Sequence, residues 1–142
     1  MLKKINCLIT LCVALCITAC ATTQPPKLVS DPDVYPVYQG CESVDQSQMI
    51  NCFSKKVIKL FRRKFNTNVA SDNGLTGKLR SKVKFVINAD GEIDQINVNA
   101  PHPALEAEII RVINEIPALT PGIHEGKRVS VPFSFPFVFS IH

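Results

Sequence analysis

The six cysteines of this 142-residue chain are the residues with the most specific chemistry, and their positions divide them into two groups. Four lie among the first twenty residues, and the other two are Cys41 and Cys52. A thiol can carry a lipid, form a disulfide or bind a metal, so the neighbours of each cysteine decide between these chemistries. The segments around the two groups differ sharply, which indicates two different roles.

The first twenty residues have the pattern of a secretory signal that ends in a lipidation site. Lys3 and Lys4 precede a mostly apolar run over residues 5–19, which is shorter than the about 20 residues that a membrane-spanning helix needs. The run ends in Ile-Thr-Ala-Cys, which resembles the lipobox of bacterial lipoproteins and implies cleavage before Cys20 and attachment of lipid to its thiol. We expect a signal peptide over residues 1–19; the alternatives are a retained signal anchor and a buried apolar helix.

The residues after Cys20 are polar and rich in proline, as expected for a tether that leaves a membrane. We expect residues 20–34 to be a flexible tether, whose roughly fourteen residues span at most about 50 Å, and a folded domain over residues 35–142. No aspartate directly follows Cys20, and in many Gram-negative bacteria that absence is associated with the outer membrane. The expected location is the periplasmic face of the envelope, on the outer rather than the inner membrane.

Cys41 and Cys52 are the cysteines left for the folded domain. Exported proteins fold under oxidising conditions, so a disulfide between the two is the expected state. It would close a loop of about twelve residues and stabilise the fold by roughly 3 kcal/mol. Two reduced, buried thiols are the alternative. We expect no metal site, because the chain has no second cysteine pair and its histidines lie far apart.

Composition and motifs exclude several classes of protein. Hydrophobic residues make up 46% and charged residues 20%, which fits neither a disordered acidic tail nor a polytopic membrane protein. The formal charge of +4 falls to +2 once Lys3 and Lys4 leave with the leader, so nucleic acid is not an expected partner. Ser43, Ser47 and Ser54 lie in no Gly-x-Ser-x-Gly motif, and no phosphate-binding glycine loop or His-Glu-x-x-His motif is present. We expect neither an enzyme nor a cofactor.

The elements that must position these residues follow from hydrophobic periodicity. Residues 47–65 repeat apolar side chains at intervals of three and four, which predicts a helix that Asp45 or Ser47 could cap. The cations of this segment fall mainly on its other faces: Lys55, Lys56, Lys59, Arg62 and Arg63. They form either an ordinary solvated face or a surface for an anionic lipid or an acidic partner.

A β-hairpin is expected after a connection over residues 66–77. Residues 78–87 alternate between apolar and polar side chains and predict a half-buried strand. A turn over residues 88–91 follows, with glycine at a positive φ in its last position. The apolar positions of the next strand change parity, which predicts a bulge near Asp94 and Gln95.

A second helix and a last strand complete the expected elements. Prolines bound the helix, which opens at Pro103 and ends at Pro117. A loop through residues 120–127 then leads to a strand over residues 129–139, whose odd positions are all apolar.

The order and spacing of these segments resemble the C-terminal domain of TonB. The matching positions are Gly77, Phe85-Val86-Ile87, Asp90-Gly91, Ile93, Ile96 and Val98, followed after the second helix by Thr120-Pro121-Gly122, Gly126-Lys127 and Val129. Gly40-Cys41-Glu42 and Cys52-Phe53 resemble the versions of that domain in Bacteroidetes-type bacteria. The resemblance covers about residues 37–139, although Asn66-Thr67 and Leu119 stand where family members often have Tyr-Pro and Trp.

The resemblance implies an α+β fold, with a small three-stranded antiparallel sheet and two helices packed on one face. It also implies a peptide-binding module, since this domain of TonB grips the TonB box, an extended periplasmic segment of outer-membrane receptors. The chain differs from TonB in having a lipobox and a short tether instead of a motor-coupling membrane helix and a long linker. Three hypotheses follow: a lipid-anchored module that captures such a peptide, a structural or interaction lipoprotein that keeps only the fold, and a partial transducer whose motor link another protein supplies.

The last strand is the candidate edge on which an extended peptide would add as a further strand. Pro132 and Pro136 lack N–H donors and share one parity, so their side of the strand must be the free edge of the sheet. The expected peptide-binding positions are Ser130, Pro132, Ser134 and Pro136, with Ser134 as the outward donor. The phenylalanines at 133, 135 and 137 are expected in the core. Either the prolines protect the edge from aggregation, or the edge binds mainly through carbonyls and about 10²-fold more weakly.

Overall fold

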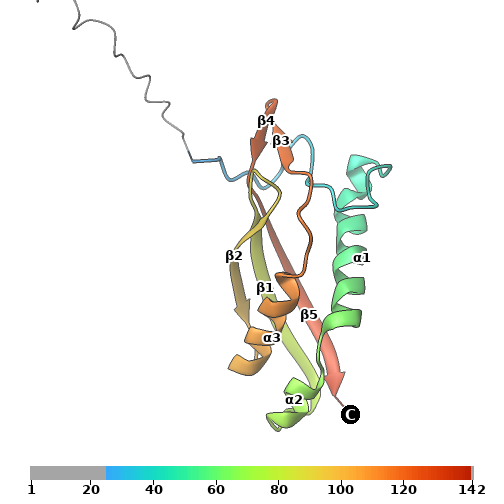
Figure 1. Ribbon diagram of the computed structural model, residues 1–142, viewed down its shortest axis with the longest axis vertical. Coiled ribbons are helices and arrows are strands. Elements are labelled where there is room, and N and C mark those ends of the chain that lie inside the picture. The colour runs from blue at the N-terminus through green and yellow to red at the C-terminus, as the bar shows by residue number, and fades with distance from the viewer. Residues whose placement is uncertain (1–24, 142) are drawn as a thin grey trace, which may run out of the picture.

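The computed structural model of the protein describes residues 25–141 (Figure 1). The signal peptide expected over residues 1–19 and the lipidation expected at Cys20 lie outside the described residues. Both stay predictions, as does the domain boundary at residue 35.

Three strands form the main sheet in the order β2-β1-β5, each antiparallel to its neighbour (Figure 1). They span Gly77–Ile87 (β1), Ile93–Asn99 (β2) and Val131–Ile141 (β5). In β1 the odd-numbered side chains from Leu79 onward are buried, whereas the even-numbered lysines and arginine are exposed. The alternation predicted for this strand is confirmed, and it gives the sheet one buried face and one open face.

The turn between β1 and β2 and the bulge in β2 are also confirmed. Gly91 adopts a φ of 84°, and its N–H donates to the carbonyl of Asn88. The register of β2 against β1 shifts at Gln95, which has a φ of 50°. The extra residue explains why Ile93 and Ile96 differ in parity and yet both pack toward the core.

Helices α1 (Gln46–Lys64) and α3 (Pro103–Ile113) cover the buried face of the sheet (Figure 1). α1 begins after Asp45, although the Asp45 side chain makes no capping hydrogen bond. The core joins residues of both helices, of β1 and of the segment after α3: Phe53, Val57, Leu60, Phe61, Val83, Phe85, Ile87, Ile109, Val112, Ile113, Ile116 and Leu119. The fold class expected from the resemblance, α+β with helices on one face, is confirmed.

Three short elements were not expected. Helix α2 (Asn68–Asp72) lies in the connection before β1, and strands β3 (Gly122–His124) and β4 (Lys127–Val129) form a hairpin where a loop was expected. One helical turn and three-residue strands are too short to show a hydrophobic period. The hairpin turn has Glu125 and Gly126 both at positive φ, as two-residue hairpin turns require.

The first described residues pack along this hairpin. Isolated bridges join Leu28 to Ser130, Val34 to Ile123 and Val37 to Thr120. Among the residues between, Val29, Pro32 and Pro36 are buried. The contacts with the domain thus begin at Lys27, whose carbonyl accepts from the Ser130 N–H, well before the domain boundary expected at residue 35.

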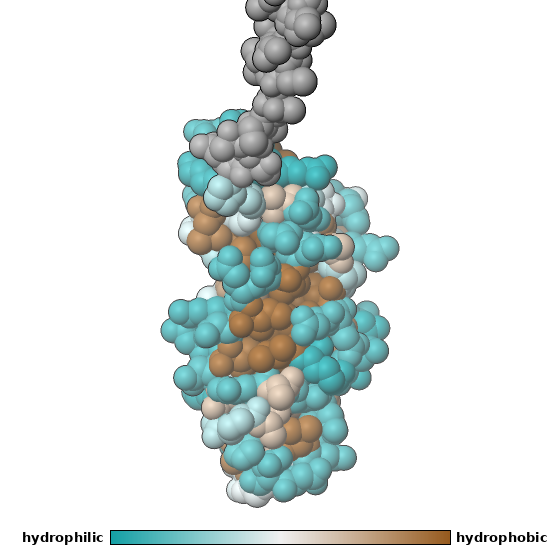
Figure 2. Space-filling view, turned by 60° about the vertical axis from the view of Figure 1, so that its left-hand side comes forward, coloured by the Kyte–Doolittle hydropathy of each residue, from teal (hydrophilic) through white to brown (hydrophobic). Residues whose placement is uncertain are grey.

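All strand pairings, core clusters and the disulfide of the described residues fall between Lys27 and Ile141, so this stretch contains a complete core. Figure 2 brings forward the side on which β2 lies in Figure 1 and shows an apolar band bordered by hydrophilic residues. Within residues 25–141, no helix combines the length and the apolarity that crossing a bilayer requires.

Candidate functional site

An apolar groove of about 580 Å³ lies between α1 and β5. Ile50, Ser54 and Ile58 form a row with a spacing of four residues on its α1 side, and the two isoleucines are exposed. The other apolar lining consists mainly of phenylalanines from both elements: Phe53, Phe61, Phe65, Phe133, Phe135, Phe137 and Phe139. A hollow of this size and lining can accept apolar side chains of a ligand.

The aromatic rings of α1 and β5 interlock along the floor of the groove. Ring centroids lie 4.7 Å apart for Phe53 and Phe133, and 4.6 Å apart for Phe61 and Phe137. The expectation that the β5 phenylalanines are core residues is only half met, because Phe133, Phe135 and Phe137 are half-buried. They pack against the core and also line the groove.

β5 is an outer strand, so one of its edges has no strand partner over most of its length among the described residues. The register pairs Pro132 with Val86 and Pro136 with Lys82 on β1. Because proline has no N–H to donate, these two residues must turn their backbone groups away from β1. The free edge is therefore the one that the sequence predicted.

The free edge offers more donors than the sequence predicted. β5 continues to Ile141, two residues beyond the expected end of the strand. Residues of the same parity as the prolines direct their N–H groups outward. Val138, within the expected strand, and Ser140, which the extension adds, therefore join Ser134 as donors. A peptide on this edge would thus meet three N–H groups instead of one.

One end of the free edge already has a partner. The Ser130 N–H donates to the carbonyl of Lys27 at 3.0 Å, and the Ser130 carbonyl accepts from the N–H of Val29 at 2.8 Å. The N-terminal segment runs parallel to the chain at this point. Ser130 was expected to bind the peptide, but both its backbone groups are occupied, so the edge open to a partner starts at Pro132.

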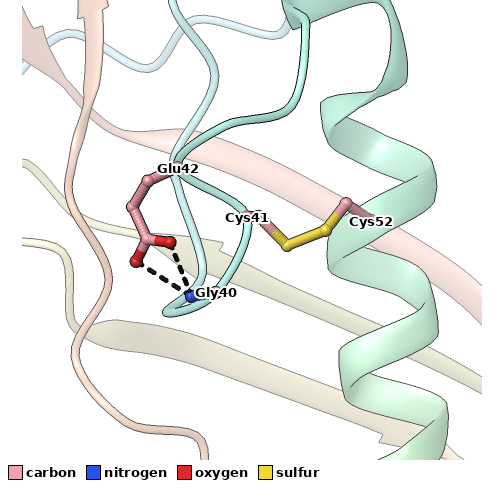
Figure 3. The surroundings of a disulfide bond; sticks show 4 residues. All are labelled: Gly40, Cys41, Glu42 and Cys52. Atoms are coloured by element: carbon pink, nitrogen blue, oxygen red, sulfur yellow. Dashed lines mark hydrogen bonds between the residues drawn. A yellow bond between two sulfur atoms is a disulfide. The ribbon is translucent and has the colours of Figure 1, made fainter.

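A disulfide joins Cys41, in the loop before α1, to Cys52 on the helix (Figure 3). The two Cα atoms are 6.1 Å apart, and Cys41 is completely buried. The pairing predicted from the sequence is thus present. In the same loop both carboxylate oxygens of Glu42 accept from the N–H of Gly40 at 2.9 Å, which lowers the pKa of that carboxyl (Figure 3).

Glu108 and Arg111 of α3 fasten the other end of α1. Arg111 donates to both Glu108 oxygens, through Nε at 2.8 Å and Nη2 at 2.7 Å, and Nη2 also donates to the carbonyl of Lys64 at 2.6 Å. Glu108 Oε1 accepts from the N–H of Asn66 at 2.8 Å. The hydrogen bonds from Arg111 hold the pKa of the buried Glu108 carboxyl below its usual value. Nothing in the sequence marked this link, because its partners are more than forty residues apart.

The groove itself was also missed, although its signal was available. Ile50 and Ile58 lie beside the apolar stripe of the helix and not in its centre, a position that widens the apolar face beyond what the core needs. Between residues 25 and 141, no group of three or more His, Cys, Asp or Glu side chains could hold a metal ion. The site consists of a mainly apolar surface, whose lining also includes Arg62, and of backbone groups, an arrangement suited to binding an extended peptide.

Comparisons with known proteins relate the chain to one family. The family model described as Gram-negative bacterial TonB protein C-terminal matches residues 67–141. The chain is similar to the NMR solution structure of the Helicobacter pylori TonB C-terminal domain, with 19% identity and a TM-score of 0.44, over 71% of this chain and 87% of that one. A search of the curated proteins found no match. Because the family model covers more than half of the residues, the chain belongs to the family of Gram-negative bacterial TonB protein C-terminal domains.

Proposed function

We propose that the protein is a periplasmic binding module, anchored to the outer membrane by lipid on Cys20, that captures extended peptides at the free edge of β5. The TonB box of an outer-membrane receptor is the peptide that we expect it to bind. Domains of this family are interaction modules generally linked to TonB-dependent transport. The observation that carries the proposal is the position of the apolar groove directly beside the free edge.

Strand addition would use both features at once. The N–H groups of Ser134, Val138 and Ser140 and the outward carbonyls of β5 would pair with the peptide backbone, each bond contributing about 1 kcal/mol. Successive side chains of an extended peptide point to opposite faces, so every second side chain would enter the groove between α1 and β5. Each apolar side chain buried there would contribute about 1.5–3 kcal/mol.

A second candidate function is favoured by the backbone of the same strand. Pro132 and Pro136 remove two donors, and the N-terminal segment occupies Ser130. An edge that is protected in this way suits a structural or interaction lipoprotein that keeps the fold without binding a TonB box.

A peptide titration separates the two functions. The ¹⁵N-labelled protein, residues 25–142, is titrated with a synthetic TonB-box peptide of a receptor from the same genome, and with a scrambled peptide as the control. We expect chemical-shift changes at Ser134, Val138 and Ser140 and at the groove residues with the first peptide alone. If no peptide shifts these signals at millimolar concentration, capture at the edge is wrong and the second function stands.

A further inference from the structure

The open face of the sheet carries a row of four cations on β1. Lys78, Arg80, Lys82 and Lys84 alternate with buried residues, so all four side chains project from the same face and are exposed. At about 3.4 Å per residue, the row is about 20 Å long.

The residues that pair with these cations on the neighbouring strands are short and uncharged. On β5 the directly paired residues are Ser140, Val138, Pro136 and Ser134, in the order of the four cations. On β2, Lys82 pairs with Asn99 and Lys84 with Asn97. None of these partners is acidic and none is longer than asparagine, so the directly paired residues neither neutralise nor cover the cations.

No ion pair in the part of the chain that the structure describes involves any of the four cations. The acid nearest in register is Asp94, which is paired with Val86 beyond the end of the row. An open hollow of about 360 Å³ lies on this face, and Arg80, Lys82 and Asn99 contribute to its lining. It provides room for an anionic group between two cations.

The cations of α1 differ, because several have neighbours of their own. Lys64 forms an ion pair with Glu115 at 3.0 Å. Lys56 lies close enough to Glu42 to help lower the pKa of that carboxyl. Burial raises the pKa of the Tyr38 hydroxyl, and the nearby Arg63 partly opposes that shift. The row on β1 is therefore the better candidate for an external anionic partner.

We propose that the open face of the sheet docks on the anionic phospholipid surface of the membrane. Chain length supports this occupant, because the contacts with the domain begin at Lys27, seven residues after the expected lipid on Cys20. Those residues span at most about 25 Å, so the lipid would hold the face within reach of the headgroups. Each cation near such a surface contributes about fivefold to the partition coefficient.

This docking would leave the peptide site accessible. The groove lies on the side of the sheet that α1 covers, opposite to the row of cations. With the open face on the membrane, α1 and the groove would face the periplasm. The docking does not depend on peptide capture, and either can fail without the other.

Vesicle binding tests the proposal on residues 25–142, which carry no lipid. We expect cosedimentation with vesicles of 70% phosphatidylethanolamine and 30% phosphatidylglycerol at 50 mM NaCl. We expect no cosedimentation at 300 mM NaCl or with vesicles of phosphatidylcholine alone, because salt screens the electrostatic attraction and neutral headgroups do not provide it. No binding to the anionic vesicles would overturn the proposal, as would binding of an acidic peptide such as oligoglutamate in its place.

Two variants that each lose four positive charges separate the contribution of the open face to vesicle binding from that of the net charge. In the first, the four cations of β1 are changed to threonine, and we expect binding to fall more than about a hundredfold. In the second, Lys55, Lys56, Lys59 and Arg63 of α1 are changed to glutamine, and most of the binding should remain. Equal losses in both variants, or a larger loss in the second, would contradict the proposal.

The orientation of the domain on the membrane can be measured separately by tryptophan fluorescence, because the chain contains no tryptophan of its own. An Asn97→Trp variant places a fluorophore on the open face, and Ile58→Trp places one at the rim of the groove. On addition of the anionic vesicles we expect a blue shift of fluorescence for the first variant alone. A blue shift for Ile58→Trp alone would place the helix side on the membrane and overturn the proposal.

Discussion

At the scale of single residues, two links hold the helix that forms one wall of the groove. The Cys41–Cys52 disulfide fixes its beginning, and the contacts of Glu108 and Arg111 fix its end. The disulfide could be predicted from cysteine number and compartment. The second link could not, because it depends on a tertiary approach between α3 and the connection after α1.

Loss of the disulfide should destabilise the fold by about 3 kcal/mol, since it closes a loop between residues eleven apart in sequence. The measurement is urea unfolding of the wild type with and without a reducing agent. A Cys41→Ala/Cys52→Ala variant serves as the control and should not respond to the reducing agent. An unchanged midpoint for the reduced wild type would contradict this prediction.

Glu108→Gln should destabilise the protein by about 1–3 kcal/mol at pH 7, because Arg111 would lose its charged partner. The pKa of Glu108 is lower in the folded state than its usual 4.5, so the unfolded chain takes up the proton first as the pH falls. The stability from Glu108 is therefore complete above about pH 4.5 and is lost as the pH falls through the lowered pKa. Urea unfolding between pH 7 and pH 3 should show the difference from wild type shrinking; a constant difference would refute this assignment.

At the scale of elements, local geometry should decide stability at the β1–β2 turn and peptide affinity at the rim of the groove. The turn packs on the segment after α3, where the Leu119 N–H donates to the Gly91 carbonyl at 2.8 Å. The sequence predicted the turn from its Asn-Ala-Asp-Gly composition, but not the contact with a segment almost thirty residues away.

Gly91→Ala should therefore cost more than backbone strain alone. A Cβ at Gly91 would lie 1.7 Å from the Leu119 carbonyl oxygen, whereas one at Gly74, also at positive φ, would meet nothing within 4 Å. We expect Gly74→Ala to cost about 1 kcal/mol and Gly91→Ala at least about 3 kcal/mol. Thermal unfolding of both variants gives the comparison, and equal losses would show that the approach of Leu119 does not matter.

Ile58→Glu should weaken binding of a TonB-box peptide about tenfold or more without changing stability. Ile58 lines the groove but is half-exposed, so the charge would oppose apolar ligand side chains and not the core. Isothermal titration of residues 25–142 measures the affinity. Asn51→Glu adds the same charge to an exposed position of α1 outside the groove and should leave the affinity unchanged; a loss in both variants would exclude the groove.

At the scale of the whole molecule, the long alternating strand, both main helices and the free edge were predictable, because each rests on periodicity or on the missing donor of proline. The pairing of residues 28–37 with the β3–β4 hairpin was not. That segment is rich in proline and charge, and its order comes from isolated bridges to the hairpin, which no local pattern encodes. The walls of the groove come from two elements far apart in sequence, so only its α1 side, where Ile50 and Ile58 widen the apolar face, had a signal in the sequence.

Deleting residues 25–34 should destabilise the domain by at least about 2 kcal/mol, because the buried side chain of Val29 and four backbone hydrogen bonds would be lost. Urea unfolding of residues 35–142 against residues 25–142 measures the effect. Residues 27–142 are the control and should match the longer chain. Equal stability of all three would place the domain boundary at residue 35.

The attachment of the N-terminal segment also decides how the molecule would carry a mechanical load. A pull on the chain before Lys27 would reach the hydrogen bonds at Ser130 and pass directly into β5. This is the strand on which a captured peptide would pair. A force between the membrane and such a peptide would thus run through one strand and its neighbours in the sheet, and it would not cross α1 or the disulfide.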